Sequence, residues 1–369
     1  MALPLFANDI LTIDIGFRYI KILQIKRKKN NSLVVVNFGI GDTPKGCIKN
    51  GAINDKERVI AEIKKVMHEQ NLDAKEAKIV ISGTNIITRI MMIDKVPEEE
   101  VDKKAWEEIK ESLPINFSEH SVDYKLLGVI NENGTEKIKL FVTAVSKKII
   151  TSYIDILNSL NLKPVAVDTP ANSISKFFQK EVKYEESENW IKKKRRIKSS
   201  SSNTYAVIDM GSETTIVNII KDKSPEFNRV LLMGGSNIDN AIARTLELEQ
   251  RHMDKAERYK KMYGIAVKDP NNELENTCCK TAKAVVDEII KNIKVCFDFY
   301  QNRCAGETVS RIYTIGGGSM LKGLGDYMEQ TLDVPVYPIN ALTIDGIEFV
   351  QGLNLEKINY LINAIGVSF

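Results

Sequence analysis

The sequence contains little of the chemistry that many metalloenzymes and secreted proteins use. Its three histidines, His68, His120 and His252, are scattered along 369 residues, which argues against a histidine-based metal site or a catalytic triad. The five cysteines are odd in number and form no CxxC pair, so reduced thiols are expected and a disulfide framework is not. Any bound metal should therefore have oxygen ligands.

Long apolar runs and a strong net charge are also missing. No window reaches the roughly 18 consecutive apolar residues that a membrane-spanning helix needs, and the opening MALPLFANDI lacks the basic region of a signal peptide. The 52 basic and 49 acidic residues leave a net charge of +3, which does not indicate nucleic-acid binding. We expect a cytoplasmic protein with no nucleic-acid partner, which meets a membrane only at its surface.

Two stretches of the chain repeat one short pattern. LTIDIGFRYIKILQIK begins at residue 11 and TYAVIDMGSETTIVNII at residue 204, and each places an Asp, an apolar residue and a Gly between two apolar runs. Alternating apolar residues and turn signals predict three strands around each copy. These strands are expected at 10–16, 19–26 and 32–39, and at 204–211, 214–220 and near 227–235. The repeat predicts an α/β protein with two similar halves.

The residues between the two copies follow other patterns. Residues 39–165 are expected to form an inserted α+β subdomain, with amphipathic helices at 55–71, 97–112 and 147–161 and strands at 77–83, 86–94, 121–130 and 138–145. A strand at 163–168 and a helix at 170–180 follow. Residues 185–203, EESENWIKKKRRIKSSSSN, have the composition of a linker. Its basic residues 192–198 would suit either an anionic membrane surface, at about 1 kcal/mol per charge, or a solvated loop.

After the second copy the sequence is mostly helical and then rich in glycine. Helices are expected at 236–247, 254–264 and through 281–301, where apolar residues recur every three or four positions. The segment 310–332 reads as a strand, a glycine turn and a helix.

The repeated turns are candidates for phosphate binding. A tight turn with Gly exposes backbone N–H groups to phosphate oxygens, and an Asp beside it can hold a hydrated Mg²⁺. One copy alone could be an ordinary β-turn, but two copies favour a two-sided phosphate site. Three successive glycines at the end of a strand leave bare backbone for a flat ligand. The candidates are Asp14, Gly16 and Lys21; Asp209, Gly211, Ser212, Thr214 and Thr215; and Gly316, Gly317, Gly318 and Met320.

These parts, in this order, resemble the actin-like ATPase superfamily, whose fold is a duplicated ribonuclease H-like unit. Within it, the blocks NGAINDKERVIAEIKKVM, KIVISGTNIITRIMMIDKVPEEEV, LLMGGSNIDNAIARTL and NAIGVSF resemble the PilM family of type IV pilus assembly. The resemblance covers nearly the whole chain. It implies two actin-type halves around a nucleotide cleft, with an inserted subdomain of the kind found in FtsA. The first actin-type subdomain would comprise 1–38, 166–184 and 331–369, and the second would comprise 204–235 and 306–330. The insert would cover 39–165, the linker 185–203 and a helical subdomain 236–305.

The resemblance also implies ligands and partners. ATP with Mg²⁺ would bind in the cleft, with Asp14 and Asp209 near the metal and with Glu257 and Lys260 reaching the adenosine. On its own, AERYKKMYG is only a solvated helix segment. Asp168 would orient the attacking water, or would serve only as a turn residue or helix N-cap. The implied partner is the cytoplasmic N-terminal tail of a PilN-like membrane protein, in a groove beside the insert. The pilus assembly ATPase and a second copy of the chain are further candidates.

Three residues depart from the pattern that the resemblance implies. Phe17 and Arg18 stand where serines are usual, and Glu213 brings a carboxylate close to the expected phosphates. Lys21 matches the family position, although a strand lysine can also point to solvent. We expect nucleotide binding to persist and hydrolysis to be weak or absent.

Two alternative functions share this fold. An FtsA-like division protein usually ends in an amphipathic membrane-targeting helix, whereas this sequence ends at NAIGVSF, directly after its last expected core element. A small-molecule kinase would need a catalytic Asp and a polar cluster for its substrate, and no such cluster stands out. A pilus assembly scaffold is the function that the sequence favours.

Overall fold

The computed structural model describes residues 9–30, 32–132, 134–180, 182–184, 203–249, 252–304, 306–339, 342–350 and 357–369. The expected linker and its basic residues 192–198 therefore lie outside the described residues, apart from Asn203. Among the described residues, no helix is both long enough and apolar enough to cross a membrane.

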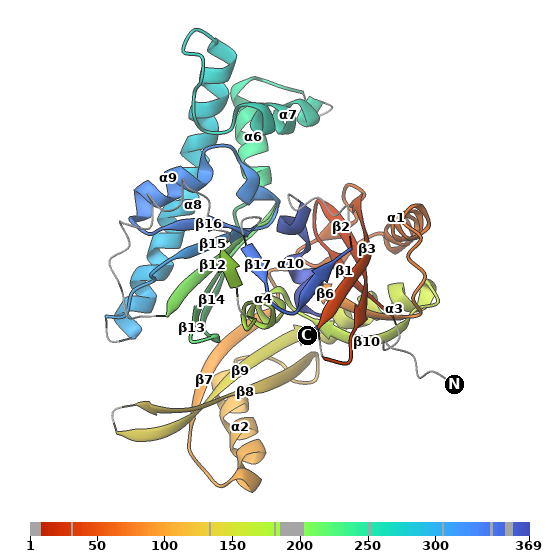
Figure 1. The fold of residues 1–369 in the computed structure, drawn as a ribbon, viewed down its shortest axis with the longest axis vertical. Helices are drawn as coiled ribbons and strands as arrows, with labels where there is room; N and C mark the ends of the chain where they lie inside the picture. Colours follow the sequence, from red (N-terminus) through yellow and green to blue (C-terminus); the bar gives the residue numbers. More distant parts are fainter. Residues whose placement is uncertain are drawn as a thin grey trace.

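The N-terminal sheet has six strands in the order β10-β6-β1-β2-β3-β18 (Figure 1). β1 and β3 run antiparallel to β2, whereas β6 and β10 extend the sheet in parallel beside β1. In sheet order the strands are β10 (Lys163–Asp168), β6 (Glu76–Ile81), β1 (Ile10–Ile15), β2 (Tyr19–Arg27), β3 (Leu33–Asp42) and β18 (Ile347–Phe349). The three strands expected at the start of the chain are confirmed.

The second sheet repeats this arrangement. β12 and β13 form an antiparallel hairpin, β14 follows β13, and β15 and β16 extend the sheet in parallel beside β12. In sheet order the strands are β14 (Ser224–Leu231), β13 (Thr215–Lys221), β12 (Thr204–Met210), β15 (Ile312–Ile315) and β16 (Val336–Pro338). The repeated sequence pattern is therefore a repeated sheet topology, and the α/β class is confirmed.

Helices separate and cover the two sheets. α1 (Lys56–Glu69) and α3 (Lys147–Ser159) pack on one face of the first sheet. α4 (Pro170–Phe178) and α10 (Ile358–Gly366) lie between the two sheets, in a shared core that includes Phe177, Phe178 and Tyr313. The outer face of the second sheet is covered by α8 (Glu273–Arg303), α6 (Gly235–Thr245) and α9 (Leu324–Leu332).

A third sheet stands apart, with the strand order β7-β9-β8 and its own core against α2 (Glu98–Ser112). Its strands are β7 (Ile87–Asp94), β8 (His120–Glu132) and β9 (Thr135–Ser146). At the opposite end of the molecule lie α6, α7 (Met253–Tyr263) and the first part of α8 (Figure 1). Smaller elements are β4 (Ile48–Lys49) with β5 (Ala52–Ile53), and β11 (Val182–Tyr184) with β17 (Leu342–Ile344).

The third sheet and α2 comprise fewer residues than the insert expected at 39–165. β6 pairs in parallel with β1, as β15 pairs with β12 in the other half, so residues 76–81 belong to the first sheet. Similarly, β16 joins the second sheet, although 331–369 was expected in the first half. Strands that pair in parallel are joined by long crossover connections, so they lie far apart in the sequence. The apolar periodicity of one strand therefore does not indicate which strand it pairs with.

Candidate functional site

The two repeated turns have the same backbone geometry. The N–H of Gly16 donates to the carbonyl oxygen of Tyr19 over 2.9 Å, and the N–H of Gly211 donates to that of Thr214 over 2.8 Å. Each turn joins the first two strands of its sheet, β1 to β2 and β12 to β13. The turns are thus equivalent residue by residue, at an offset of 195 positions.

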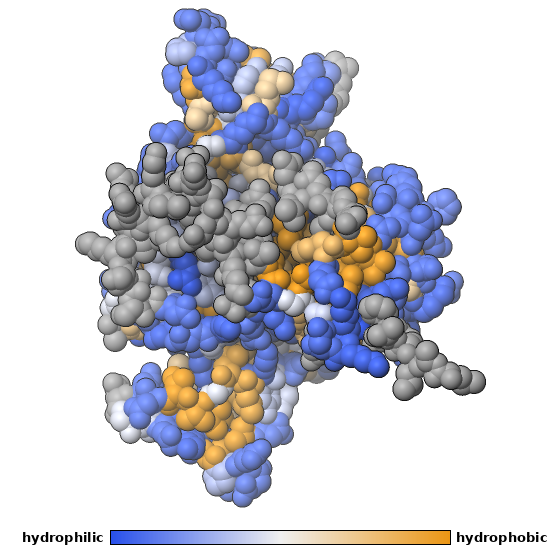
Figure 2. All heavy atoms as spheres, viewed as in Figure 1, coloured by the Kyte–Doolittle hydropathy of each residue, from blue (hydrophilic) through white to orange (hydrophobic). Residues whose placement is uncertain are grey.

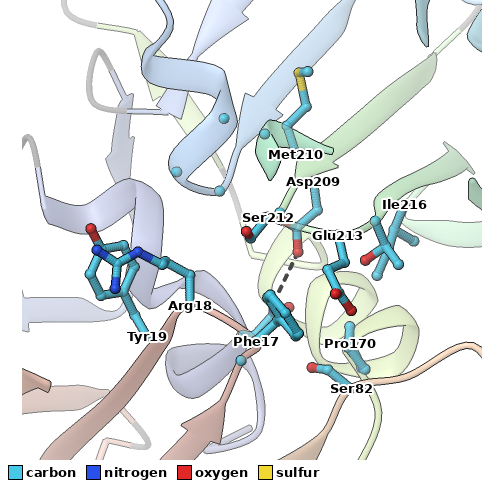
Figure 3. A pocket seen from close by; sticks show the side chains of 18 of the residues that line it. Phe17, Arg18, Tyr19, Ser82, Pro170, Asp209, Met210, Ser212, Glu213 and Ile216 are labelled. Carbon is cyan, nitrogen blue, oxygen red and sulfur yellow. Dashed lines mark hydrogen bonds between the residues drawn. The ribbon is translucent and has the colours of Figure 1, made fainter. Parts of the chain in front are cut away.

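Both turns open into one cavity of about 410 Å³, within the range typical of ligand sites. Figure 3 shows Phe17, Arg18 and Tyr19 of the first turn and Asp209, Ser212 and Glu213 of the second around this cavity. The structure brings together these residues that were singled out from sequence: Asp14, Gly16, Lys21, Asp209, Gly211, Ser212, Thr214, Glu257, Lys260, Gly316, Gly317, Gly318 and Met320.

Two buried carboxylates, Asp14 and Asp209, lie at the bases of the turns. Asp14 is 1% exposed and pairs with Lys21 over 2.9 Å, while its second oxygen, Oδ1, has no hydrogen-bond partner. The Asp209 carboxylate accepts a 3.0 Å hydrogen bond from Asn363. Burial raises the pKa of Asp209, and the charge of Asp14 adds to this effect against the opposing bond from Asn363. The ionised forms of the two carboxylates thus disfavour each other, and a cation bound near both would relieve this repulsion.

The glycine segment approaches the same carboxylate. Gly316 has φ 81° and ψ 165°, a conformation essentially restricted to glycine. A Cβ there would lie 2.4 Å from Oδ1 of Asp209, and one at Gly317 would lie 2.7 Å from the ring of Tyr360. The expected helix after the glycines begins only at Leu324, following a short 3₁₀ turn over Gly317–Met320. Bare backbone therefore forms this wall of the cavity.

α7 supplies charged residues at the glycine end of the cavity. Glu257 pairs with Lys261 over 2.7 Å and with Arg18 over 3.2 Å. Lys260 pairs with Asp239 over 2.8 Å and also donates to the carbonyl oxygen of Gly235 over 3.0 Å. These partners fix both side chains at the cavity wall.

Comparison with known proteins agrees with this architecture. A model of the family "Type IV pilus assembly protein PilM" matches residues 12–367. The chain belongs to the PilM family. The family predicted from sequence is thus confirmed, over the FtsA-like and kinase alternatives.

Solved structures share the fold of this PilM-family chain. It is similar to a chain of a "PilM-PilN type IV pilus biogenesis complex", with 20% identity, 97% of each chain covered and a TM-score of 0.76. It is also similar to the ethanolamine utilization protein EutJ from Carboxydothermus hydrogenoformans, with 11% identity, coverage of 100% of this chain and 92% of that one, and a TM-score of 0.55. A MamK double helical filament matches at 10% identity, with 98% of each chain covered and a TM-score of 0.51. The fold is actin-like, as expected.

Two residues singled out from sequence do not line the cavity of this PilM-family protein. Thr215 is fully buried and donates its hydroxyl to the carbonyl oxygen of Met233 over 2.8 Å, so it offers no group to a ligand. Asp168 accepts hydrogen bonds from the N–H of Thr169, from Asn172 and from Lys176. Its carboxylate is therefore engaged at the start of α4.

Sequence reasoning missed the contribution of α10 to the cavity. Asn359, Tyr360 and Asn363 line it, and the Oδ1 atoms of both asparagines lack partners. A signal was present in INYLINAIG, because two asparagines four residues apart share one face of an otherwise apolar helix.

Two of the residues that differ from the family pattern lie at the turn tips. Phe17 is 39% exposed, and Glu213 extends toward Pro170 and Ser82 in Figure 3. Burial raises the pKa of Glu213, and the charge of Lys49 opposes this rise. Glu213 thus points to the first half of the molecule and not along the second hairpin.

Proposed function

We propose that this PilM-family protein binds ATP with Mg²⁺ in the cavity between its two halves. The observation that carries the proposal is the convergence of two equivalent glycine turns, one from each half, on a single cavity. Free N–H groups and hydroxyls at such turns bind phosphate oxygens from two sides. The bare glycine wall at Gly316–Gly318, with Tyr360 beside it, suits the flat base of a nucleotide.

The donor set in the cavity fits a hydrated Mg²⁺. This ion keeps most of its waters and needs only one or two carboxylates. Asp14 and Asp209 would hold it, and the unpartnered Oδ1 of Asp14 would accept a hydrogen bond from a metal-bound water. Among the described residues, no group of three or more His, Cys, Asp or Glu could hold a metal ion by itself. The metal would therefore arrive with the phosphates, and its role would be to neutralise their charge.

We propose that the nucleotide is held more than it is turned over. Asp168, the residue expected to orient the attacking water, has its carboxylate occupied by Thr169, Asn172 and Lys176. Lys21, a candidate for phosphate contact, is paired with Asp14. Slow hydrolysis fits a scaffold whose state changes on nucleotide binding.

We propose that the partner is the cytoplasmic N-terminal tail of a PilN-like membrane protein, bound beside the third sheet. The similar solved structure is of a PilM–PilN complex. β8 is an edge strand among the described strands, and its Leu126 and Val129 are 50% and 51% exposed. Figure 2 shows apolar side chains gathered on this part of the molecule. Edge strands of this kind accept extended peptides.

Binding to such a tail would place the protein in the cytoplasm at the inner face of the membrane. Contacts with the pilus assembly ATPase and self-association belong to the same proposal. Membrane attachment through 192–198, which lie outside the described residues, does too.

Titration calorimetry tests both parts of this function. ATP with Mg²⁺ is titrated first, and then a synthetic PilN-like tail peptide with and without ATP. We expect both ligands to bind, and Leu126→Asp with Val129→Asp to weaken the peptide alone. Val295→Asp, at a residue of α8 that is 60% exposed, is the matched control. A peptide that binds the double variant as well as wild type would exclude β8 as the docking strand.

A further inference from the structure

The two turn tips carry opposite charges at equivalent positions. Arg18 occupies in the first turn the position that Glu213 occupies in the second, at the same offset of 195 residues. Each side chain is directed to the other half of the molecule. Arg18 donates to Glu257 of α7, and Glu213 extends toward Pro170 and Ser82 (Figure 3). The tip of the first turn therefore links the two halves across the cavity, through the bond between Arg18 and Glu257.

Both ends of the Arg18 guanidinium are in use. One terminal nitrogen donates to Asp42 over 2.9 Å and the other to Glu257 over 3.2 Å. The group also lies over the ring of Tyr19, 5.0 Å from the ring centre (Figure 3). Burial acts to lower the pKa of Arg18, but the charges of Glu257 and Asp42 outweigh it and leave this pKa raised. Arg18 is thus a charged group in a fixed position.

Contacts connect Glu257 to the glycine wall. Lys261 pairs with Glu257 over 2.7 Å, and Tyr19 is close enough to contribute to the raised pKa of Lys261. Tyr19 packs edge-on against Tyr360 at 5.6 Å, and the Tyr360 ring lies against Gly317. Burial acts to raise the pKa of Glu257, yet Lys261 and Arg18 together leave it lowered. The carboxylate is therefore ionised and oriented at the end of the cavity that suits a base and sugar.

We propose that Arg18 is a positioning residue for the nucleoside end of the ligand. Held by Asp42, it orients the Glu257 carboxylate across the cleft, so that the nucleoside subsite is complete only when the two halves are closed. This inference rests on the proposed nucleotide binding and assigns Arg18 a task other than contacting phosphate. Its nitrogens are already bonded to two carboxylates, which leaves it a weaker phosphate ligand than a free arginine.

The test compares the affinities of ATP, ADP, AMP and adenosine for wild type and for Arg18→Ala, measured by calorimetry. Arg258→Ala is the control, because Arg258 forms a 3.2 Å pair with Asp254 on the exposed side of α7, the helix that carries Glu257. We expect Arg18→Ala to weaken all four ligands by a similar factor, about three- to tenfold, and the control to change none of them. In a Glu257→Gln background, Arg18→Ala should have little further effect.

Two results would overturn the inference while nucleotide binding stands. A loss that grows from adenosine to ATP would show that Arg18 contacts the phosphates directly, and unchanged affinities would show that it positions nothing. Failure of wild type to bind any of the four ligands would instead refute the proposed function as well. Arg18→Lys separates positioning from folding, because one ammonium can retain the pair with Glu257 but cannot bridge both carboxylates. It should restore part of the affinity.

Discussion

Substitution of Gly316 by alanine should destabilise the protein and distort the cavity at once. At φ 81° and ψ 165°, a residue with a side chain pays about 1–3 kcal/mol of backbone strain. The new Cβ would also lie 2.4 Å from Oδ1 of Asp209 and 2.6 Å from the carbonyl oxygen of Met210. Forced overpacking of this kind costs about 1–3 kcal/mol more. We therefore expect a loss of about 2–6 kcal/mol in the free energy of unfolding, with weaker nucleotide binding.

Alanine substitutions at two other glycines separate the cost of backbone strain from the cost of overpacking. Gly346 has φ 82° with nothing within 4 Å of an added Cβ, so alanine there should cost only about 1–2 kcal/mol. Gly325 lies in α9 with open space around it, and alanine there should stabilise by about 0.5–1 kcal/mol. Urea denaturation followed by circular dichroism measures all three. If Gly316→Ala were no less stable than Gly346→Ala, the close approach of the glycine wall to Asp209 would be refuted.

Three further predictions concern the packing between the parts. Lys139, 2% exposed on β9, pairs with Glu226 of the second half, so Lys139→Ala should cost about 2–4 kcal/mol in urea denaturation; a cost below 1 kcal/mol would show that the pair is dispensable. Phe177→Ala, in the core between the sheets, should cost about 3–5 kcal/mol in the same assay; a markedly smaller cost would contradict close packing of that core. Glu213 has a raised pKa in the folded protein, so its ionisation disfavours folding as the pH rises above the ordinary value of 4.5. Glu213→Gln should therefore match wild type in stability at pH 4 and exceed it at pH 7, and a variant that is less stable at pH 7 would contradict this sign.

The sequence predicted local elements and the duplication well, because both depend on short-range patterns. The first hairpin and the apolar stripe of α8 follow from alternation and from steps of three and four residues. The turn residues of both hairpins were found because the pattern occurs twice. Thirteen of the singled-out residues line the cavity, including both buried carboxylates.

Long-range relationships were harder to predict. The insert was drawn too wide because β6 looks like any other strand until its parallel pairing with β1 is known. Thr215 was misplaced because the alternation along β13 turns its hydroxyl toward Met233. The bridge from Arg18 to Glu257 joins residues 239 positions apart, and no local pattern indicates it.

Binding of a fluorescent ATP analogue with Mg²⁺ to wild type, Asp14→Ala and Asp209→Ala tests the central claim most directly. If the two turns form a two-sided nucleotide site, wild type binds and each variant binds at least about tenfold more weakly, as expected when a charged contact is removed. Absence of binding in wild type, or undiminished binding in both variants, would contradict the claim. The protein would then be an actin-like scaffold that works without a nucleotide in this cavity.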